Sequence, residues 1–317
     1  MKTGSVALSA LLLLGTAAKA QEAPATGWSS SNEVVVVTAQ QPGPAFWHIK
    51  KGNSEIYILG TIAEMPKGLN WNSNHLAEVI AGAHAVLIPP VASSGILSAG
   101  WFLLTHRGLL SMPDGKTLEE TLPPDLKARF VAARSSLAIP AEKLEDDPPI
   151  LVAFELQKKF GEAAKLDSDE PTNRVKKIAG EEHVSLRPIA DYSALDIIKE
   201  ALRLPLAAQQ TCLEESLTKL EQRKNHAMAL AQAWAIGDLK AIKANYTGRS
   251  FNKCVKQVPS FGRITDQAVK DYLKAIDDAL SKPGKTVMLT DIGSLLRGTG
   301  VVDQLHAKGI LIEGPTE

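Results

Sequence analysis

The sequence has no excess of either charge and few aromatic residues. Lysine and arginine together number 35, and aspartate and glutamate also number 35. A chain without a basic surplus lacks the electrostatic footprint that binds nucleic acid or anionic lipid. Aromatic residues make up only 5% of the chain, and no paired-carboxylate motif is present. The composition therefore predicts a protein without a nucleic-acid partner, and it gives no sign of a sugar site.

The sequence also lacks the paired histidines that are typical of metal sites. None of the 7 histidines is spaced as His-x-x-x-His or His-x-His, the spacings that place two imidazoles on one face of a helix or strand. Local spacing therefore predicts no metal site. The histidines are His48, His75, His84, His106, His183, His226 and His306.

Long hydrophobic runs are missing, and the apolar run at the start of the chain is short. Lys2 precedes an apolar stretch from Val6 to Ala18, and Ala18-Lys19-Ala20 has the small-x-small pattern of a cleavage site. The stretch falls short of the ~20 residues that cross a bilayer. We expect residues 1–20 to be a signal peptide cleaved after Ala20. The chain would then reach the periplasm with no integral membrane segment, and would keep 33 basic against 35 acidic residues because Lys2 and Lys19 are lost.

Cysteine is scarce, since Cys212 and Cys254 are the only two. Pairs of cysteines in exported proteins usually bridge, because the compartment is oxidising. A reactive thiol would need an activating neighbour, and no such motif surrounds either residue. We therefore predict a Cys212–Cys254 disulfide.

Residues 21–44 are rich in alanine, proline, serine, glutamine and glycine, and this composition predicts a flexible leader. Inside it, Val34 to Val37 form a strongly β-prone run. One interpretation is an extended segment that docks on a sheet edge or stays loose. The other is an energy-coupling box, because residues 32–39 are similar to the start of TonB-dependent outer-membrane receptors.

The ordered part of the chain begins with a predicted β-hairpin. Alternating runs over residues 46–50 and 55–60 are joined across Gly52-Asn53, a strong turn signal. Ser73 is then placed to cap a helix, and residues 85–88 are apolar enough for a buried strand.

Residues 96–104 are almost continuously apolar and include Trp101 and Phe102. A stretch of this kind is most often a core helix. The other interpretation is a surface patch that meets a membrane or a partner. We predict the core helix.

The middle of the chain, from about residue 115 to 281, has a mostly helical pattern. Pro123-Pro124 and Pro148-Pro149 stand where helices begin, since proline is tolerated in the first turn. Gly237-Asp238 marks the end of one helix and the cap of the next. A short strand is expected at residues 184–187.

The last part of the chain returns to β/α alternation, with a strand expected at residues 285–291, a helix at 300–307 and a strand at 309–313. The β-rich ends therefore bracket a helical middle. We predict a mixed α/β (α+β) fold, in which one mixed sheet is built from both chain ends and is flanked and capped by the helical middle. Residues 45–317 would form this single domain.

Three motifs carry a resemblance to a known family. They are Gly60-Thr61-Ile62-Ala63, Trp234-Ala235-Ile236-Gly237-Asp238-Leu239, and the segment from Thr286 to Gly309. In this order they resemble the TraB/PrgY/GumN family from about Pro44 to Glu313. The resemblance implies a Tiki-type, metalloprotease-like fold.

The chain departs from the family pattern at the positions that carry the chemistry. The first motif, Gly60-Thr61-Ile62-Ala63, has Ala63 in place of a histidine. The last motif has Ser294 after Gly293 where a second histidine is expected, and Ile88-Pro89 stand where members tend to carry a glutamate. A catalytic divalent metal needs about three protein ligands and an open position. The resemblance therefore implies a degenerate, catalytically inactive member with no expected cofactor, which keeps its cleft to bind an envelope peptide, glycan or protein.

Other polar residues near these motifs leave an enzymatic alternative open. Glu64 follows the first motif, and Asp291 and Ser294 belong to the last. If the two motifs meet, these three residues are the catalytic candidates of a divergent metal-dependent hydrolase. A Ser294–His306–Asp291 triad is a weaker candidate, because no Gly-x-Ser-x-Gly elbow surrounds the serine.

Two further alternatives involve no catalysis. One is a backbone anion cradle, for which the candidates are Gly60, Gly293, Gly298 and Gly300, with Arg297 adding a charge. The helical middle, over residues 120–240, would otherwise serve as an interaction platform in an envelope assembly.

Overall fold

The computed structural model describes residues 42–63, 65–167, 170–246, 254 and 259–315. The predicted signal peptide, almost all of the leader with its Val34–Val37 run, and Glu64 lie outside the described residues. Within the described part of the chain, no helix is both long and apolar enough to span a bilayer.

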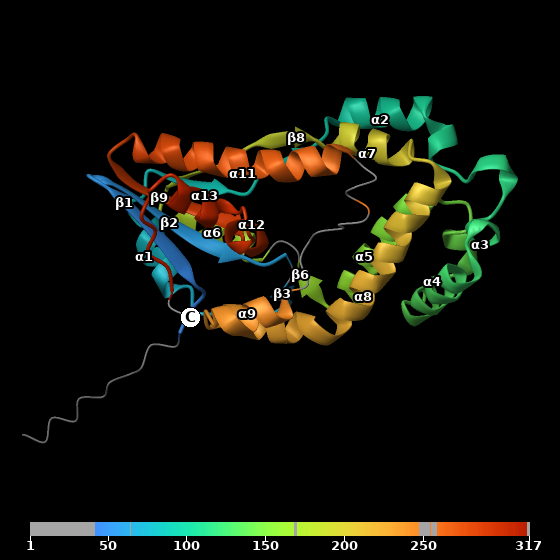
Figure 1. Ribbon diagram of the computed structural model, residues 1–317, viewed down its shortest axis with the longest axis horizontal. Helices are drawn as coiled ribbons and strands as arrows, with labels where there is room; N and C mark the ends of the chain where they lie inside the picture. Colours follow the sequence, from blue (N-terminus) through green and yellow to red (C-terminus); the bar gives the residue numbers. More distant parts are fainter. Residues whose placement is uncertain (1–41, 64, 168–169, 247–253, 255–258, 316–317) are drawn as a thin grey trace, which may run out of the picture. The chain divides into compact units, whose positions relative to one another are not determined.

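One five-stranded mixed sheet organises the fold, in the order β1-β2-β9-β4-β7 (Figure 1). The hairpin β1–β2 is antiparallel, and β2, β9, β4 and β7 are parallel neighbours. The predicted hairpin and the predicted joining of both chain ends in one sheet are confirmed. The strands are β1 Phe46–Lys51, β2 Ser54–Thr61, β4 Ala85–Ile88, β7 Ser185–Pro188 and β9 Gly284–Asp291.

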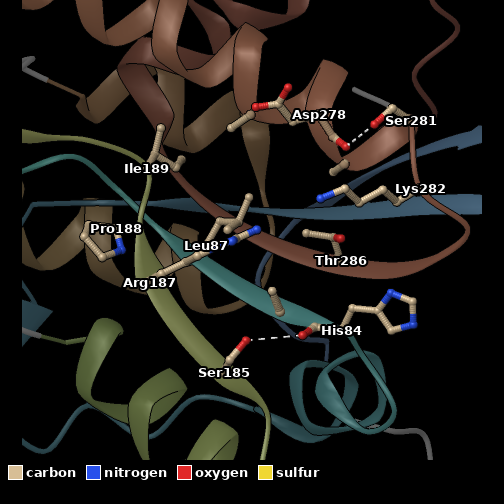
Figure 2. A pocket seen from close by; sticks show the side chains of 13 residues that line it. His84, Leu87, Ser185, Arg187, Pro188, Ile189, Asp278, Ser281, Lys282 and Thr286 are labelled. Atoms are coloured by element: carbon tan, nitrogen blue, oxygen red, sulfur yellow. Dashed lines mark hydrogen bonds between the residues drawn. The ribbon is translucent and has the colours of Figure 1, made fainter.

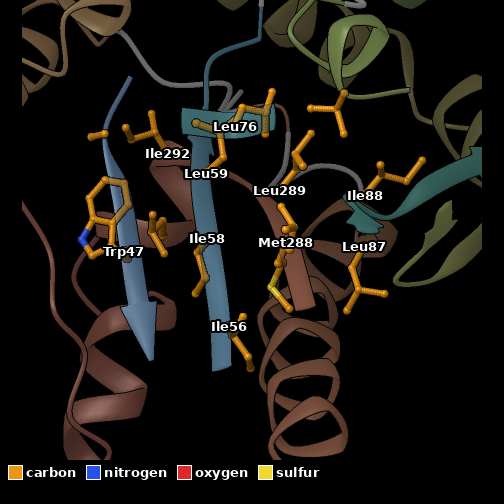
Figure 3. Packing of buried hydrophobic residues seen from close by; sticks show 14 of the residues in the cluster. Trp47, Ile56, Ile58, Leu59, Leu76, Leu87, Ile88, Met288, Leu289 and Ile292 are labelled. Atoms are coloured by element: carbon orange, nitrogen blue, oxygen red, sulfur yellow. The ribbon is translucent and has the colours of Figure 1, made fainter. Parts of the chain in front are cut away.

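The central strands are apolar because helices cover both faces of the sheet. Ile56 and Ile58 of β2 and Met288 of β9 are fully buried (Figure 3). Helix α11 (Pro259–Leu280) lies on one face, and α1 (Asn74–Ile80) and α6 (Thr172–Glu181) lie on the other (Figure 1). A strand buried on both sides reads as a continuous apolar run, as Ala85 to Ile88 does.

The helical middle packs around a second apolar cluster that includes Leu118, Phe130, Leu156 and Leu213. The predicted helix starts at the two proline pairs are confirmed, since α4 begins at Pro124 and α5 at Pro149. The remaining helices are α2 Ile96–Thr105, α3 Leu118–Thr121, α4 Pro124–Ser136, α5 Pro149–Ala163, α7 Ala194–Leu202, α8 Leu206–Ala235, α9 Leu239–Asn245, α12 Ile292–Leu296 and α13 Val301–Ala307. Two small sheets pair β3 Met65–Pro66 with β6 Leu166–Asp167, and β5 Val91–Ser93 with β8 Asp191–Ser193.

The predicted strand at residues 309–313 does not form. The segment makes one isolated antiparallel bridge, in which His48 N–H donates to the Glu313 carbonyl at 2.7 Å and Glu313 N–H donates back at 2.8 Å. Beyond the bridge, Gly314 lies so close to the Trp47 indole that a Cβ would meet it at 2.6 Å. The end of the chain therefore touches β1 at one residue pair instead of extending along it.

The predicted N-cap at Ser73 is also wrong in its detail. Helix α1 does follow Ser73, but the Ser73 side chain makes no capping hydrogen bond. The Asn72 side chain accepts from the Asn74 N–H at 3.0 Å instead. The side-chain oxygen of Asn72 therefore accepts a backbone N–H at the start of α1, which is the role that was expected of Ser73.

The apolar stretch at residues 96–104 forms a helix, α2, but it is not the predicted core helix. Phe102 is only 3% exposed, whereas Trp101 is 69% and Leu104 is 62% exposed. Phe102 belongs to a small cluster with Ile150, Leu202 and the two cysteines. Of the α2 side chains that the structure describes, Phe102 is covered by this cluster, whereas Trp101 and Leu104 stay exposed.

The two cysteines form a disulfide between α8 and residue 254, across a sequence separation of 42. Closing a loop of this size stabilises the fold by about 2–4 kcal/mol, largely by restricting the unfolded chain. We expect the Cys212→Ala/Cys254→Ala variant to lose about this much unfolding free energy. Urea titrations of wild type and variant give the value, and two reactive thiols in the native wild type would contradict the bridge.

Candidate functional site

The degenerate motif positions lie together at the carboxyl ends of three parallel strands. Strands β2, β9 and β4 are adjacent and parallel, with Thr61 opposite Asp291 and Leu87 opposite Met288. Ala63 follows β2, Ser294 follows β9, and Ile88-Pro89 lie at the end of β4. Three parallel strands therefore end side by side where open α/β sheets bind ligands. We call residues Thr61, Ala63, Pro89, Asp291 and Ser294 the strand-end site.

Packing explains the glycine that opens the first motif. The Trp234 indole is fully buried and donates from Nε1 to the Gly60 carbonyl at 2.6 Å. A Cβ on Gly60 would meet the Trp47 ring at 2.9 Å and Ile292 Cδ1 at 3.0 Å. Gly60 therefore lets three large side chains converge behind the end of β2.

The second motif is a turn that holds Trp234 in place. Gly237 has φ of +72°, and the Asp238 N–H donates back to the Ala233 carbonyl at 3.0 Å, which ends α8. The Asp238 side chain then accepts from the Ala241 N–H at 2.9 Å and begins α9. The predicted end-and-cap role of Gly237-Asp238 is confirmed, and it makes this motif part of the scaffold.

Asp291 is a buried, hydrogen-bonded polar group of the strand-end site. It is 9% exposed, and its Oδ1 accepts from the Ser294 N–H at 3.1 Å and from the Tyr246 hydroxyl at 3.2 Å. The first of these bonds caps α12. A Cβ on Gly293 would meet the Tyr246 hydroxyl at 2.3 Å, so this glycine admits the tyrosine to the carboxylate.

The cap predicts a specific result at Asp291. Asp291→Ala removes the acceptor of the α12 N-terminus and should lower the unfolding free energy by about 0.5–2 kcal/mol. Asp291→Asn keeps a side-chain oxygen that caps about as well, and it should cost much less. Chemical denaturation of both variants compares them, and equal losses would contradict the capping role.

The candidate triad does not assemble. Ser294 is half-buried on α12, whereas His306 is exposed on α13. The structure describes all three residues, and no hydrogen bond joins His306 to Ser294 or to Asp291. In a triad the aspartate would accept from the histidine, whereas Asp291 accepts from the backbone N–H of Ser294.

Several backbone N–H groups of the glycine-rich turn form hydrogen bonds within the turn. The Gly300 N–H donates to the Arg297 carbonyl at 2.7 Å, and the Arg297 N–H donates to the Gly293 carbonyl at 3.0 Å. The Thr299 N–H donates to the Asp303 side chain at 2.9 Å. These backbone donors are engaged within the turn, so they are not presented to a ligand.

The donors at the strand-end site do not fit a family-type metal. The three degenerate positions offer a methyl group, a neutral hydroxyl and an isoleucine–proline pair, whereas a catalytic divalent site needs about three ligands with lone pairs. Among the residues that the structure describes, no three His, Cys, Asp or Glu side chains come together to hold a metal ion. Glu64 lies outside this statement.

Sequence reasoning missed Tyr246 and Trp47, which shape this site. Tyr246 follows α9 without any motif, and only its contact with Asp291 reveals its role. The sequence pattern predicts only that Trp47 belongs to a hairpin, whereas in the structure its ring lies against Gly60. Neither residue carried a local signal, because both act through contacts that are distant in sequence.

The matching family model is described as the TraB/PrgY/gumN family, and it covers residues 45–314. The chain therefore belongs to this family. No curated protein and no solved structure matches it significantly.

Proposed function

We propose that this chain is a catalytically inactive, periplasmic member of the TraB/PrgY/gumN family. Its strand-end site binds an envelope peptide, glycan or protein without cleaving it. Export rests on the N-terminal pattern of residues 1–20, and the Cys212–Cys254 bridge is compatible with an oxidising compartment. No metal cofactor is part of this function.

One observation carries the proposal, namely the convergence of three degenerate positions. The sheet order places the ends of β2, β9 and β4 together, so Ala63, Ser294 and Ile88-Pro89 share one edge. The scaffold around them is intact, with Trp234 on Gly60 and Asp291 on α12. A fold that keeps the frame of the site but lacks its ligands supports binding more than metal hydrolysis.

The alternative is a divergent hydrolase with relocated groups, centred on Glu64, Asp291 and Ser294. The proximity of Asp291 and Ser294 favours it. The bond that Asp291 accepts from the Ser294 N–H weighs against it, because this is the ordinary contact of a helix cap.

The two functions differ in a peptide-cleavage assay. Purified mature chain is incubated with a peptide library and Zn²⁺ or Mn²⁺, and products are read by mass spectrometry. We expect no cleavage above buffer. Cleavage that disappears in Glu64→Gln, Asp291→Asn or Ser294→Ala would overturn the proposal, and Asp291→Asn is informative because it preserves the cap.

The binding half of the proposal needs its own test. A photo-crosslinking side chain at position 63, in cells that export the protein, should capture an envelope molecule. The matched control carries the same side chain at Lys176, an exposed position on α6. Equal capture at both positions, or none at position 63, would contradict ligand binding at the strand-end site.

A further inference from the structure

A cavity of about 610 Å³ lies between α11 and the β4–β7 side of the sheet (Figure 2). Its lining runs from Thr286, near the beginning of β9, along β4 and β7 to Ile189, which follows β7 and donates from its N–H to the Ile88 carbonyl at 3.0 Å. Thr286 is in its floor, five residues before Asp291, which is about 16 Å along β9 at ~3.3 Å per residue. Its volume falls within the ~300–1,000 Å³ that small-molecule pockets occupy.

The pairing of the strands builds the floor of this cavity. Thr286, Ala85 and Ser185 are cross-strand neighbours in one row, and Leu87 and Arg187 form the next row on the same face. The floor therefore alternates hydroxyl and apolar groups, with Arg187 on the edge strand β7. Since β7 is the last strand of the five-stranded sheet, this side of the cavity lies at an edge of the sheet.

One face of α11 forms the opposite wall. Ala275, Asp278 and Ala279 line the cavity, spaced three and four residues apart as one side of a helix requires. The two alanines have small side chains, and they leave space that a larger side chain would fill. Lys282 follows the end of α11 and closes this side.

Two cations point into the cavity from opposite sides. Figure 2 shows Arg187 entering from β7 and Lys282 from the loop after α11, with Thr286 and Leu87 between them. Across the described residues, neither side chain forms an ion pair or a side-chain hydrogen bond. The nearby Asp278 carboxylate is paired with Lys274 at 2.6 Å.

Asp278, which also lines the cavity, is influenced by the charges of both cations. The pKa of Asp278 is lowered, first by its hydrogen bond from Lys274 and then by the positive charges of Lys274, Lys282 and Arg187. The lining therefore holds two cations, Arg187 and Lys282, and one carboxylate, Asp278, so the cavity carries a net positive charge. Two like charges that face each other across a cavity repel, and an anion between them removes that repulsion.

We propose that this cavity binds a small organic oxyanion, a carboxylate or a phosphate ester of about monosaccharide size. Arg187 and Lys282 hold the charged group from its two sides, and the arginine fork suits two oxygens at once. Ser185 and Thr286 supply hydroxyls for the polar body of the ligand, and the alanines and Leu87 contact its carbon skeleton. The site is independent of the strand-end function.

The test is calorimetric titration of the mature protein with glucose 6-phosphate, glucuronate, citrate and glucose. We expect one or more of the anions to bind in a salt-sensitive way and neutral glucose to show no binding. A preference for glucose 6-phosphate would identify a phosphate ester, and a preference for glucuronate or citrate a carboxylate. Binding of none of the anions, or binding of glucose as tightly as its phosphate, would overturn the proposal.

Matched variants locate the binding. Arg187→Gln and Lys282→Gln should each weaken anion binding about tenfold, since each removes a charge-assisted contact. Arg203→Gln and Lys176→Gln remove equally exposed charges elsewhere and should leave binding unchanged. All four positions are exposed, so melting temperatures should match wild type. Equal weakening by the control variants would assign the binding to general surface charge and overturn the site.

Discussion

Trp234→Ala is expected to lower the unfolding free energy by about 3–5 kcal/mol, which is the cost of deleting a large core aromatic side chain. Trp234 is fully buried, packs edge-to-face on Trp71 with 5.1 Å between ring centroids, and donates to the Gly60 carbonyl. The substitution would remove the contact that joins α8 to the end of β2. Chemical denaturation followed by circular dichroism measures the loss.

A milder variant separates the hydrogen bond from the packing. Trp234→Phe keeps an aromatic ring but removes the indole N–H, and leaving a buried carbonyl without this donor should cost about 1–3 kcal/mol. A loss in Trp234→Ala below that of an exposed control, Trp101→Ala, would show that the motif tryptophan does not support the strand-end site.

Phe102→Ala is expected to cost about 3–5 kcal/mol, although its neighbour on the same apolar helix should tolerate the same change. Phe102 is 3% exposed and packs beside the disulfide, whereas Trp101 is 69% exposed. A surface substitution such as Trp101→Ala typically stays within about 0.5 kcal/mol. The pair therefore compares two adjacent aromatic residues that differ mainly in burial.

Urea denaturation of the two single variants measures this contrast. Equal destabilisation would mean that Trp101 is covered in the folded protein and that α2 is the core helix its composition suggested. A difference of several-fold in the predicted direction would support the one-sided burial of α2.

Local patterns predicted most of the sheet, because its signals lie close together in the sequence. Gly52-Asn53 gave the hairpin, and residues 285–291 and 85–88 were apolar enough for buried strands. The prolines before α4 and α5 marked helix starts, since proline fits only a first turn. These features need no knowledge of distant partners.

Burial of α2 and the fate of residues 309–313 depended on distant partners, and the sequence did not show them. An apolar helix is buried only where another element covers it, and the partner of α2 is a small cluster around the disulfide. The segment before Glu313 has β-like composition, but it pairs with β1 only through the His48–Glu313 bridge.

The candidate site was predictable in position but not in detail. Motif order placed Ala63 and Ser294 at loops after strands, and the parallel pairing of β2 with β9 brings those loops together. The capping bond of Asp291 is local, since it joins residues three apart, whereas its contact with Tyr246 joins side chains 45 residues apart in the sequence. The scaffold roles of Gly60 and Gly293 likewise depend on rings that approach from other elements.

The most direct test of the account is calorimetric titration of the mature, disulfide-bonded protein with Zn²⁺ and Mn²⁺. We propose that the strand-end site lacks the ligands that a divalent metal needs. The comparison is an Ala63→His/Pro89→Glu/Ser294→His variant, which places three donors at the three strand ends. We expect wild type to bind neither metal ion stoichiometrically and the variant to bind one metal ion per chain. Micromolar or tighter binding of one metal ion by wild type would contradict it.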